Sequence, residues 1–141
     1  MTTILARLLA VFFVLVIGGN VHADESRDIS VIQLIANPEL FNGQKVRVIG
    51  FLHLEFEGDA VYLHRDDFEN SIDKNSVAIE LDKLQIQTWR NLNNHYVMIE
   101  GSFSSVDKGH LGMRSGSLRK ITRLSNWSVK RTKKPPPERS P

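Results

Sequence analysis

The side chains with the greatest chemical potential lie in one glycine-containing stretch. Gly109 and Gly112 flank His110, with Lys108 before them and Arg114 after them. Glycines let backbone N–H groups approach a ligand closely, and the three nitrogen-bearing side chains would attract an anion. The same spacing is typical of a hairpin loop whose glycines serve only turn geometry. The sequence leaves both interpretations open.

A second group of candidate ligand contacts comes from the outer surface of the first three expected strands. This group is Arg47, Tyr62 and His64. We predict that these side chains and the three cationic loop residues together form one ligand-binding face.

A metal site would require His53, Glu55 and His64 to converge across a turn at Gly58-Asp59. In such a hairpin the two histidines would lie roughly opposite each other. Neither an H-x-x-x-H nor an H-x-H spacing is present, and the chain has no cysteine to act as a ligand. The interpretation we favour is a pair of partly exposed, hydrogen-bonding histidines, so we predict no metal and no cofactor.

Motifs of catalysis give no support for an enzyme. No serine stands in G-x-S-x-G and no G-x-x-x-x-G-K-[ST] phosphate loop is present. The acids between Arg65 and Asn75 lack the alternating pattern of a calcium loop, so we predict a solvated acidic loop there. We therefore expect a protein without catalytic residues.

The element that must position these side chains is the stretch from Lys45 to Glu57. Apolar residues alternate with charged ones, and Val46, Leu52 and Phe56 share the side expected to face inward. Gly50 interrupts the stretch near its middle. A long strand with a central glycine can bend and contribute to both halves of a small closed barrel.

The other elements follow from periodicity and turn signals. A short helix is expected from Asp28, capped by Asp28 or Ser30 and ended at Asn37-Pro38, as a plug on one end of the barrel. The slip in alternation between Leu118 and Ile121 suggests a bulge. Trp127 is expected to pack back as the closing residue. The further expected elements are strands over 60–64, 76–81, 95–104 and 116–124, with a helical segment over 82–94.

This arrangement predicts an all-β domain with minor helix, spanning residues 28–127. A helical segment between the third and fourth of five strands is the layout of an OB-fold barrel. The segments VIQLIANPELFNGQKVRVIGF and YVMIEGSF resemble the opening and the fourth strand of small exported OB-fold proteins, mostly uncharacterised and grouped with the tRNA-anticodon-binding-like domains. The resemblance covers roughly residues 30–127. It implies a barrel with a binding face and brings no catalytic residues.

Residues 1–23 have the layout of a secretory signal peptide. The apolar run Leu8–Ile17 is ten residues long, whereas a bilayer span needs ~20. We therefore expect cleavage rather than a retained anchor, no stable membrane span afterwards, and an exported protein, periplasmic or secreted. The Pro-rich stretch 130–141, with five cations and one anion, predicts a disordered basic tail.

Charge separates the expected domain from its tail. Residues 24–129 hold 12 Lys and Arg against 15 Asp and Glu, a net charge of −3. A nucleic-acid groove requires a basic face, so we expect a monomeric module that binds a protein, peptide or envelope polymer. A single-stranded nucleic-acid-binding OB domain is the alternative, and a metal-dependent enzyme or metal carrier is the least favoured.

Overall fold

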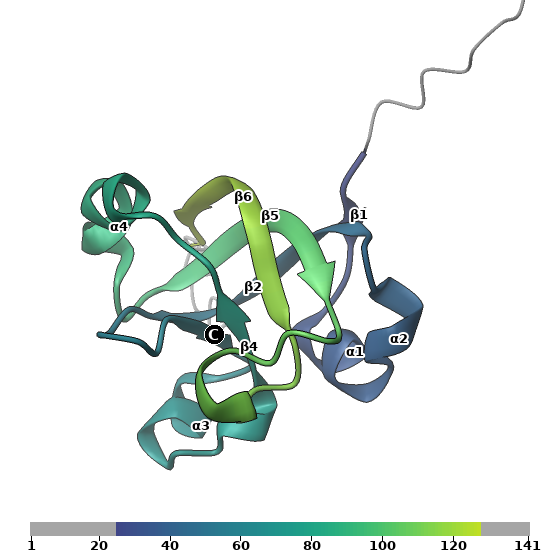
Figure 1. Cartoon of the computed structure of the whole chain (residues 1–141). Coiled ribbons are helices and arrows are strands. Elements are labelled where there is room, and N and C mark those ends of the chain that lie inside the picture. The colour runs from purple at the N-terminus through teal and green to yellow at the C-terminus, as the bar shows by residue number, and fades with distance from the viewer. Residues whose placement is uncertain (1–24, 128–141) are drawn as a thin grey trace, which may run out of the picture.

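A computed structural model describes residues 25–127 (Figure 1). The predicted signal peptide and the predicted basic tail lie outside these residues. The chain folds around strand β2 (Lys45–His53), which the sequence singles out. Residues 45–51 of β2 pair antiparallel with β5 (Tyr96–Ser104), and residues 51–53 pair antiparallel with β3 (Ala60–Tyr62). One strand therefore serves both halves of the barrel, as expected.

Gly50 occupies the position just before β2 passes from one partner to the other. A Cβ atom at Gly50 would lie 2.6 Å from the carbonyl oxygen of Tyr62 on β3. No side chain fits in that space, so the central glycine allows β2 and β3 to approach closely.

Five strands, β2 to β6, form a closed, OB-fold-like barrel. β4 (Ser76–Ile79) pairs antiparallel with β3 and parallel with β6 (Ser117–Asn126), which pairs antiparallel with β5. The strand order is β2-β3-β4-β6-β5, and the β2–β5 pairing closes it. This confirms the predicted fold class. The two-residue strand β1 (Arg27–Asp28) adds a short parallel pairing to β2.

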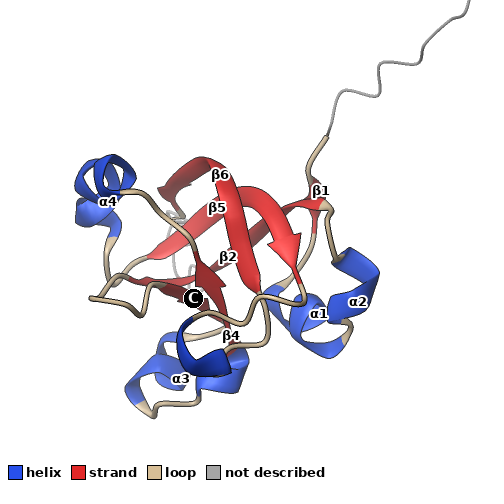
Figure 2. Ribbon diagram, in the orientation of Figure 1, coloured by secondary structure: helices blue, strands red, loops and turns tan. Residues whose placement is uncertain are grey.

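Short helices surround the strands (Figure 2). Ser30 caps α1 (Val31–Ala36), whose Val31 and Leu34 are buried in the barrel core, and α2 (Pro38–Phe41) follows at once. α4 (Lys83–Trp89) and the 3-10 turn Arg90–Leu92 join β4 to β5, where a helical segment was predicted. Further 3-10 turns cover Asp73–Asn75 and His110–Gly112.

The interior is formed by alternating residues of all five strands, closed at one end by α1. Its fully buried side chains include Val46 and Val48 of β2, Val97 and Ile99 of β5, and Leu118 of β6. The predicted bulge is confirmed: Glu100 faces Arg123 but Ser102 faces Arg119, so residues 120–122 oppose Gly101 alone.

Three expectations about local structure are wrong. The strand ends at His53 rather than Glu57, and Phe56, expected to face inward, is 92% exposed at the following turn. The stretch 65–75 contains a helix, α3 (Arg65–Glu69), in place of a solvated loop. Trp127 donates its backbone N–H to the Tyr96 carbonyl, but its side chain is 43% exposed and does not close the core.

The helix α3 forms because of Asp67, which is buried. Its carboxylate accepts hydrogen bonds from the backbone N–H of His64 (2.9 Å) and from the side-chain amide of Asn75 (2.7 Å). Phe68 then packs its ring against Phe51 and Tyr62. The helix is stabilised by one capping carboxylate and one aromatic side chain, so the sequence shows no helical repeat of apolar residues. For this reason the sequence predicts a loop here.

Candidate functional site

A cleft of about 440 Å³ opens at one end of the barrel. One wall is the β2–β3 turn (residues 54–59) and the other is the β5–β6 loop (residues 105–116). Residues 78–81, at the end of β4 and just beyond it, form the floor. These loops and the neighbouring strands are where OB-fold barrels bind oligonucleotides and oligosaccharides. The cleft is therefore our candidate functional site.

Carboxylates dominate the lining of the cleft. Glu55, Glu57 and Asp59 come from the β2–β3 turn, and Glu80 follows β4. The opposite loop contributes two titratable side chains to the lining, His110 and Arg114. Burial raises the pKa of the Asp59 carboxyl above its usual value, and the nearby Glu55 charge raises it further. Because four carboxylates line the cleft against the one cation of Arg114, the cleft presents negative charge to a ligand.

Apolar side chains stand exposed at the tips of both loops. Phe56 of the β2–β3 turn is 92% exposed and Leu111 of the β5–β6 loop is 80% exposed, with Met113 partly exposed beside it. Phe56 and Met113 both line the cleft. Large apolar side chains that are exposed to solvent beside a concave surface are typical of an interaction site.

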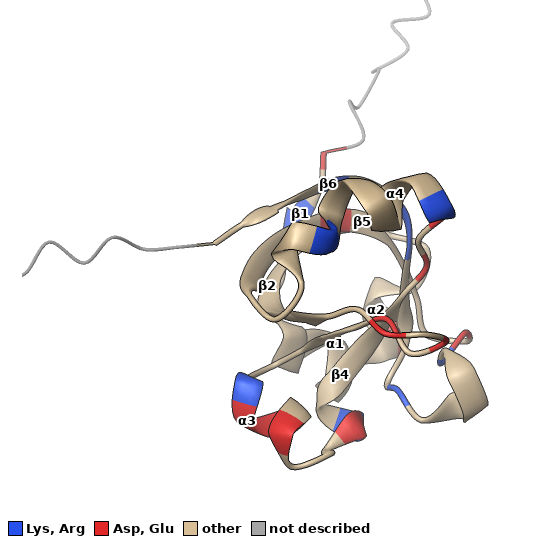
Figure 3. Ribbon diagram, turned by 90° about the vertical axis from the view of Figure 1, so that its left-hand side faces the viewer, with Lys and Arg blue, Asp and Glu red and all other residues tan. Residues whose placement is uncertain are grey.

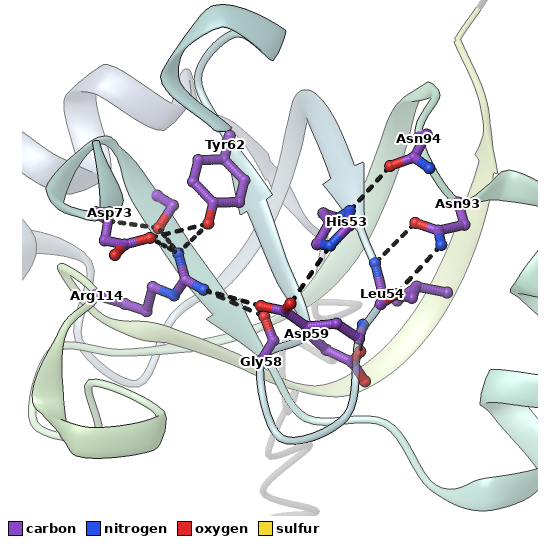
Figure 4. Close-up of polar contacts among 11 residues, drawn as sticks. His53, Leu54, Gly58, Asp59, Tyr62, Asp73, Asn93, Asn94 and Arg114 are labelled. Carbon is purple, nitrogen blue, oxygen red and sulfur yellow. Dashed lines mark hydrogen bonds and ion pairs between the residues drawn. The ribbon is translucent and has the colours of Figure 1, made fainter. Parts of the chain in front are cut away.

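Arg114 fixes the two walls of the cleft to each other (Figure 4). Its guanidinium pairs with Asp73 Oδ1 at 2.6 Å and donates to the hydroxyl groups of Tyr62 and Ser76. The same group donates to the Gly58 carbonyl of the β2–β3 turn at 3.3 Å. One side chain of the β5–β6 loop therefore holds β3, β4 and the opposite turn.

Tyr62 lies at the centre of this buried cluster. Its hydroxyl donates to Asp73 Oδ1 at 3.0 Å, and the Arg114 guanidinium lies 5.0 Å from the centre of its ring. Burial raises the pKa of the Tyr62 phenol. A neutral phenol between a cation and a carboxylate satisfies the polar groups that the cluster buries.

A second polar cluster holds the start of the β2–β3 turn. His53 Nδ1 lies 2.9 Å from Asn94 Oδ1, its Nε2 lies 3.6 Å from a Glu55 oxygen, and its ring stacks on Phe68. Asn93 exchanges hydrogen bonds with the Leu54 backbone, donating to the carbonyl and accepting from the N–H (Figure 4). The turn is thus fixed at both ends while its tip projects freely.

The predicted ligand-binding residues are distributed over several environments. His110 and Arg114 line the cleft and Lys108 is exposed nearby, but the Arg114 side chain and that of Tyr62 are buried in the cluster described above. His64 is exposed at the start of α3. Arg47 lies outside the cleft, on the outer surface of β2, where it pairs with Glu100 at 2.7 Å.

The convergence of His53 and His64 that a metal site would require does not occur. His53 faces Ala60 across the hairpin, and Tyr62 faces Phe51, so His64 lies beyond the paired residues. Over residues 25–127, no three His, Asp or Glu side chains come close enough to hold a metal ion. None of the helices within that same range has the length and apolar character required to cross a membrane.

Sequence reasoning missed the exposed apolar tips and the acidic lining of the cleft. Phe56 continues the alternation of β2 and was therefore assigned to the core. The sequence signal for the turn is Glu57-Gly58-Asp59, directly after Phe56. In the structure the turn begins before the glycine, since Glu57 already has a φ of 63°.

Comparisons with known proteins leave the ligand undefined. No family model and no curated protein sequence matches this chain. A solved structure from Leishmania major Friedlin, titled a putative aspartyl-tRNA synthetase, is similar over 72% of this chain at 10% sequence identity and a TM-score of 0.44. The similar region spans only 21% of that protein.

Proposed function

We propose that this protein is a non-catalytic, monomeric binding module that takes a basic, partly apolar segment of a protein or peptide partner in the cleft between the β2–β3 turn and the β5–β6 loop. The signal-peptide layout of residues 1–23 supports action outside the cytoplasm, in the periplasm or as a secreted protein.

One observation carries this proposal: Phe56 projects 92% exposed from a turn whose neighbouring side chains in the cleft are carboxylates. An exposed aromatic ring supplies an apolar anchor for a partner side chain. The surrounding carboxylates would pair with Lys or Arg of the same partner and would repel a phosphate backbone. For this reason we favour a basic peptide over the nucleic-acid alternative.

The cluster of Arg114 with Tyr62, Asp73 and Ser76, which we call the base of the cleft, supports the same function. Because Arg114 ties both walls together, the loop tips can present apolar groups without moving when a partner binds. Binding then loses less conformational entropy than it would with two free loops.

Fluorescence anisotropy with three labelled probes tests the proposal. The probes are a short peptide of Lys and Leu, a peptide of the same length with Glu in place of Lys, and single-stranded oligothymidylate. We expect the Lys–Leu peptide to bind, and Phe56→Ser to weaken its binding about tenfold, the effect of losing an interface anchor. The matched control is Leu40→Ser, which removes a 67% exposed apolar side chain from α2, outside the cleft.

Two results would overturn the proposal. The first is equal affinity of the Lys–Leu peptide for the wild-type protein and for Phe56→Ser. The second is oligothymidylate binding that Phe56→Ser weakens, because this would place a nucleic acid in the cleft.

A further inference from the structure

A second surface of the barrel has the opposite charge from the cleft. It is the outward side of β1, β2, β5 and β6, and we call it the basic face. It carries six cations and two carboxylates; the cations are Arg27, Lys45, Arg47, Arg119, Lys120 and Arg123, and the carboxylates are Asp28 and Glu100. Figure 3 shows Lys and Arg positions beside β1 and β6 in the upper part of the view.

The strand register arranges these side chains in rows across three strands. Lys45 faces Ser102, which faces Arg119, so two cations flank one small polar residue. In the next row Glu100 stands between two arginines, with the pairs to Arg47 at 2.7 Å and to Arg123 at 3.7 Å. Asp28 also pairs with Arg47, at 3.2 Å. The two arginines of this row are therefore matched by two carboxylates, and the excess positive charge of the face comes from its other cations.

Among the described residues, the ion pairs leave part of this charge uncompensated. No carboxylate oxygen lies within 4.0 Å of the charged groups of Lys45, Arg119 or Lys120. Glu80 and Asp82 line a hollow bordered by Arg119 and Lys120, so the basic face ends at that edge.

An apolar groove adjoins the cations. Ile49 faces Met98 in the third row, and both line a groove of about 530 Å³ with Trp127, which is 43% exposed. Arg47 lines the same groove. A tryptophan and aliphatic side chains beside a row of cations are the combination that seats a protein at the headgroup level of a bilayer.

The end of the described chain adds to the charge complementarity. Trp127 lies at the edge of the basic face, and the sequence that follows carries five cations and one anion between residues 130 and 141. Cations near a surface attract anionic lipids additively. From these observations we infer that the basic face docks on a bilayer containing anionic phospholipid, with Trp127 and Ile49 entering the headgroup region.

This inference is independent of the cleft and of its ligand. Docking through the basic face uses none of the side chains that line the cleft; Glu80, which lines the cleft, lies at the edge where the basic face ends. The barrel would thus be held at a membrane surface by one face while the loop tips remain open to a partner.

Vesicle sedimentation with the full chain tests the docking. The vesicles contain either phosphatidylcholine alone or equal parts of phosphatidylcholine and phosphatidylglycerol. We expect binding only to the second kind, weakened by added salt. The double variant Lys45→Glu/Arg119→Glu should lower the partition coefficient about tenfold or more.

The matched control is Lys83→Glu/Lys108→Glu, which makes the same change in net charge on exposed lysines of α4 and the β5–β6 loop. It should leave most of the binding in place. Equal losses in the two double variants would overturn the inference, because the attraction would then depend on total charge or on residues 130–141 rather than on the basic face.

A second readout locates the apolar contact. Brominated phosphatidylcholine mixed with phosphatidylglycerol should quench tryptophan fluorescence of the wild-type protein, and Trp127→Phe should abolish the quenching because Trp89 packs against the core. Undiminished quenching in Trp127→Phe would contradict the docking geometry. Oligothymidylate binding that Lys45→Glu/Arg119→Glu abolishes, without vesicle binding, would assign the basic face to nucleic acid and overturn the lipid assignment.

Discussion

The base and the rim of the cleft come from neighbouring residues of the same loops, yet they have opposite properties. Arg114 is 5% exposed and bonded to several elements, whereas Leu111, three residues earlier at the loop tip beside the cleft lining, is 80% exposed. The base uses polar groups to hold the loops together, and the rim displays apolar groups to solvent. We therefore expect substitutions in the base to change stability and substitutions in the rim to change binding.

The largest expected effect comes from removing the cation of the base. Arg114→Met should lower the free energy of unfolding by about 3 kcal/mol, because Asp73 loses its ion pair and the hydroxyls of Tyr62 and Ser76 lose a donor. Chemical denaturation measures this difference. Arg119→Met, an exposed cation on β6, is the control and should change stability by less than about 0.5 kcal/mol. Equal stability of both variants would contradict the distinction between base and rim.

A smaller loss is expected when only the phenol of the base is removed. Tyr62→Phe deletes one hydroxyl but keeps the Arg114–Asp73 pair, so the free energy of unfolding should fall by about 1 kcal/mol. Tyr96→Phe is the matched control: its hydroxyl accepts one hydrogen bond from the Arg65 backbone at an exposed position. A larger loss for Tyr96→Phe than for Tyr62→Phe would show that the buried cluster does not organise the base.

The sequence could predict the barrel but only part of the contrast between the buried base and the exposed rim of the cleft. Alternation along Lys45–His53, the central Gly50 and the slip near Ile121 are backbone requirements, and each leaves a local mark in the sequence. The position of Arg114 leaves no such mark. Its partners Asp73 and Gly58 are 41 and 56 residues away in the chain, and a cation in a glycine-containing loop has the same pattern whether it is exposed or buried.

The tip of the β5–β6 loop, beside the residues that line the cleft, should gain stability from a change that harms binding. Leu111 has a φ of 55°, a region that costs a leucine roughly 1 kcal/mol and that asparagine tolerates better. Leu111→Asn should therefore raise the free energy of unfolding by about 0.5 kcal/mol and weaken binding of the Lys–Leu peptide. Thermal denaturation and anisotropy on one preparation measure the two effects. A variant that is more stable and binds equally well would exclude Leu111 from the binding surface.

The smallest expected effect concerns Asp59, where the base meets the rim. Burial raises the pKa of this carboxyl above its usual 3.8, so between 3.8 and the raised pKa the folded state holds a proton that the unfolded chain has released. The free energy of unfolding must fall as pH rises through that interval. Asp59→Asn removes this loss, and its amide oxygen can still accept the hydrogen bond from the Glu55 backbone.

The variant Asp59→Asn should therefore have a higher Tm than the wild-type protein at pH 7, with a difference that shrinks toward pH 3.8 and below. Thermal denaturation across this range measures the difference. Because the Glu55 charge contributes to the raised pKa, the gain should be smaller in a Glu55→Gln background. If the gain in Tm were the same at every pH, the effect of Asp59→Asn would come from packing. The negative charge of the cleft would then not lower the stability of the folded protein.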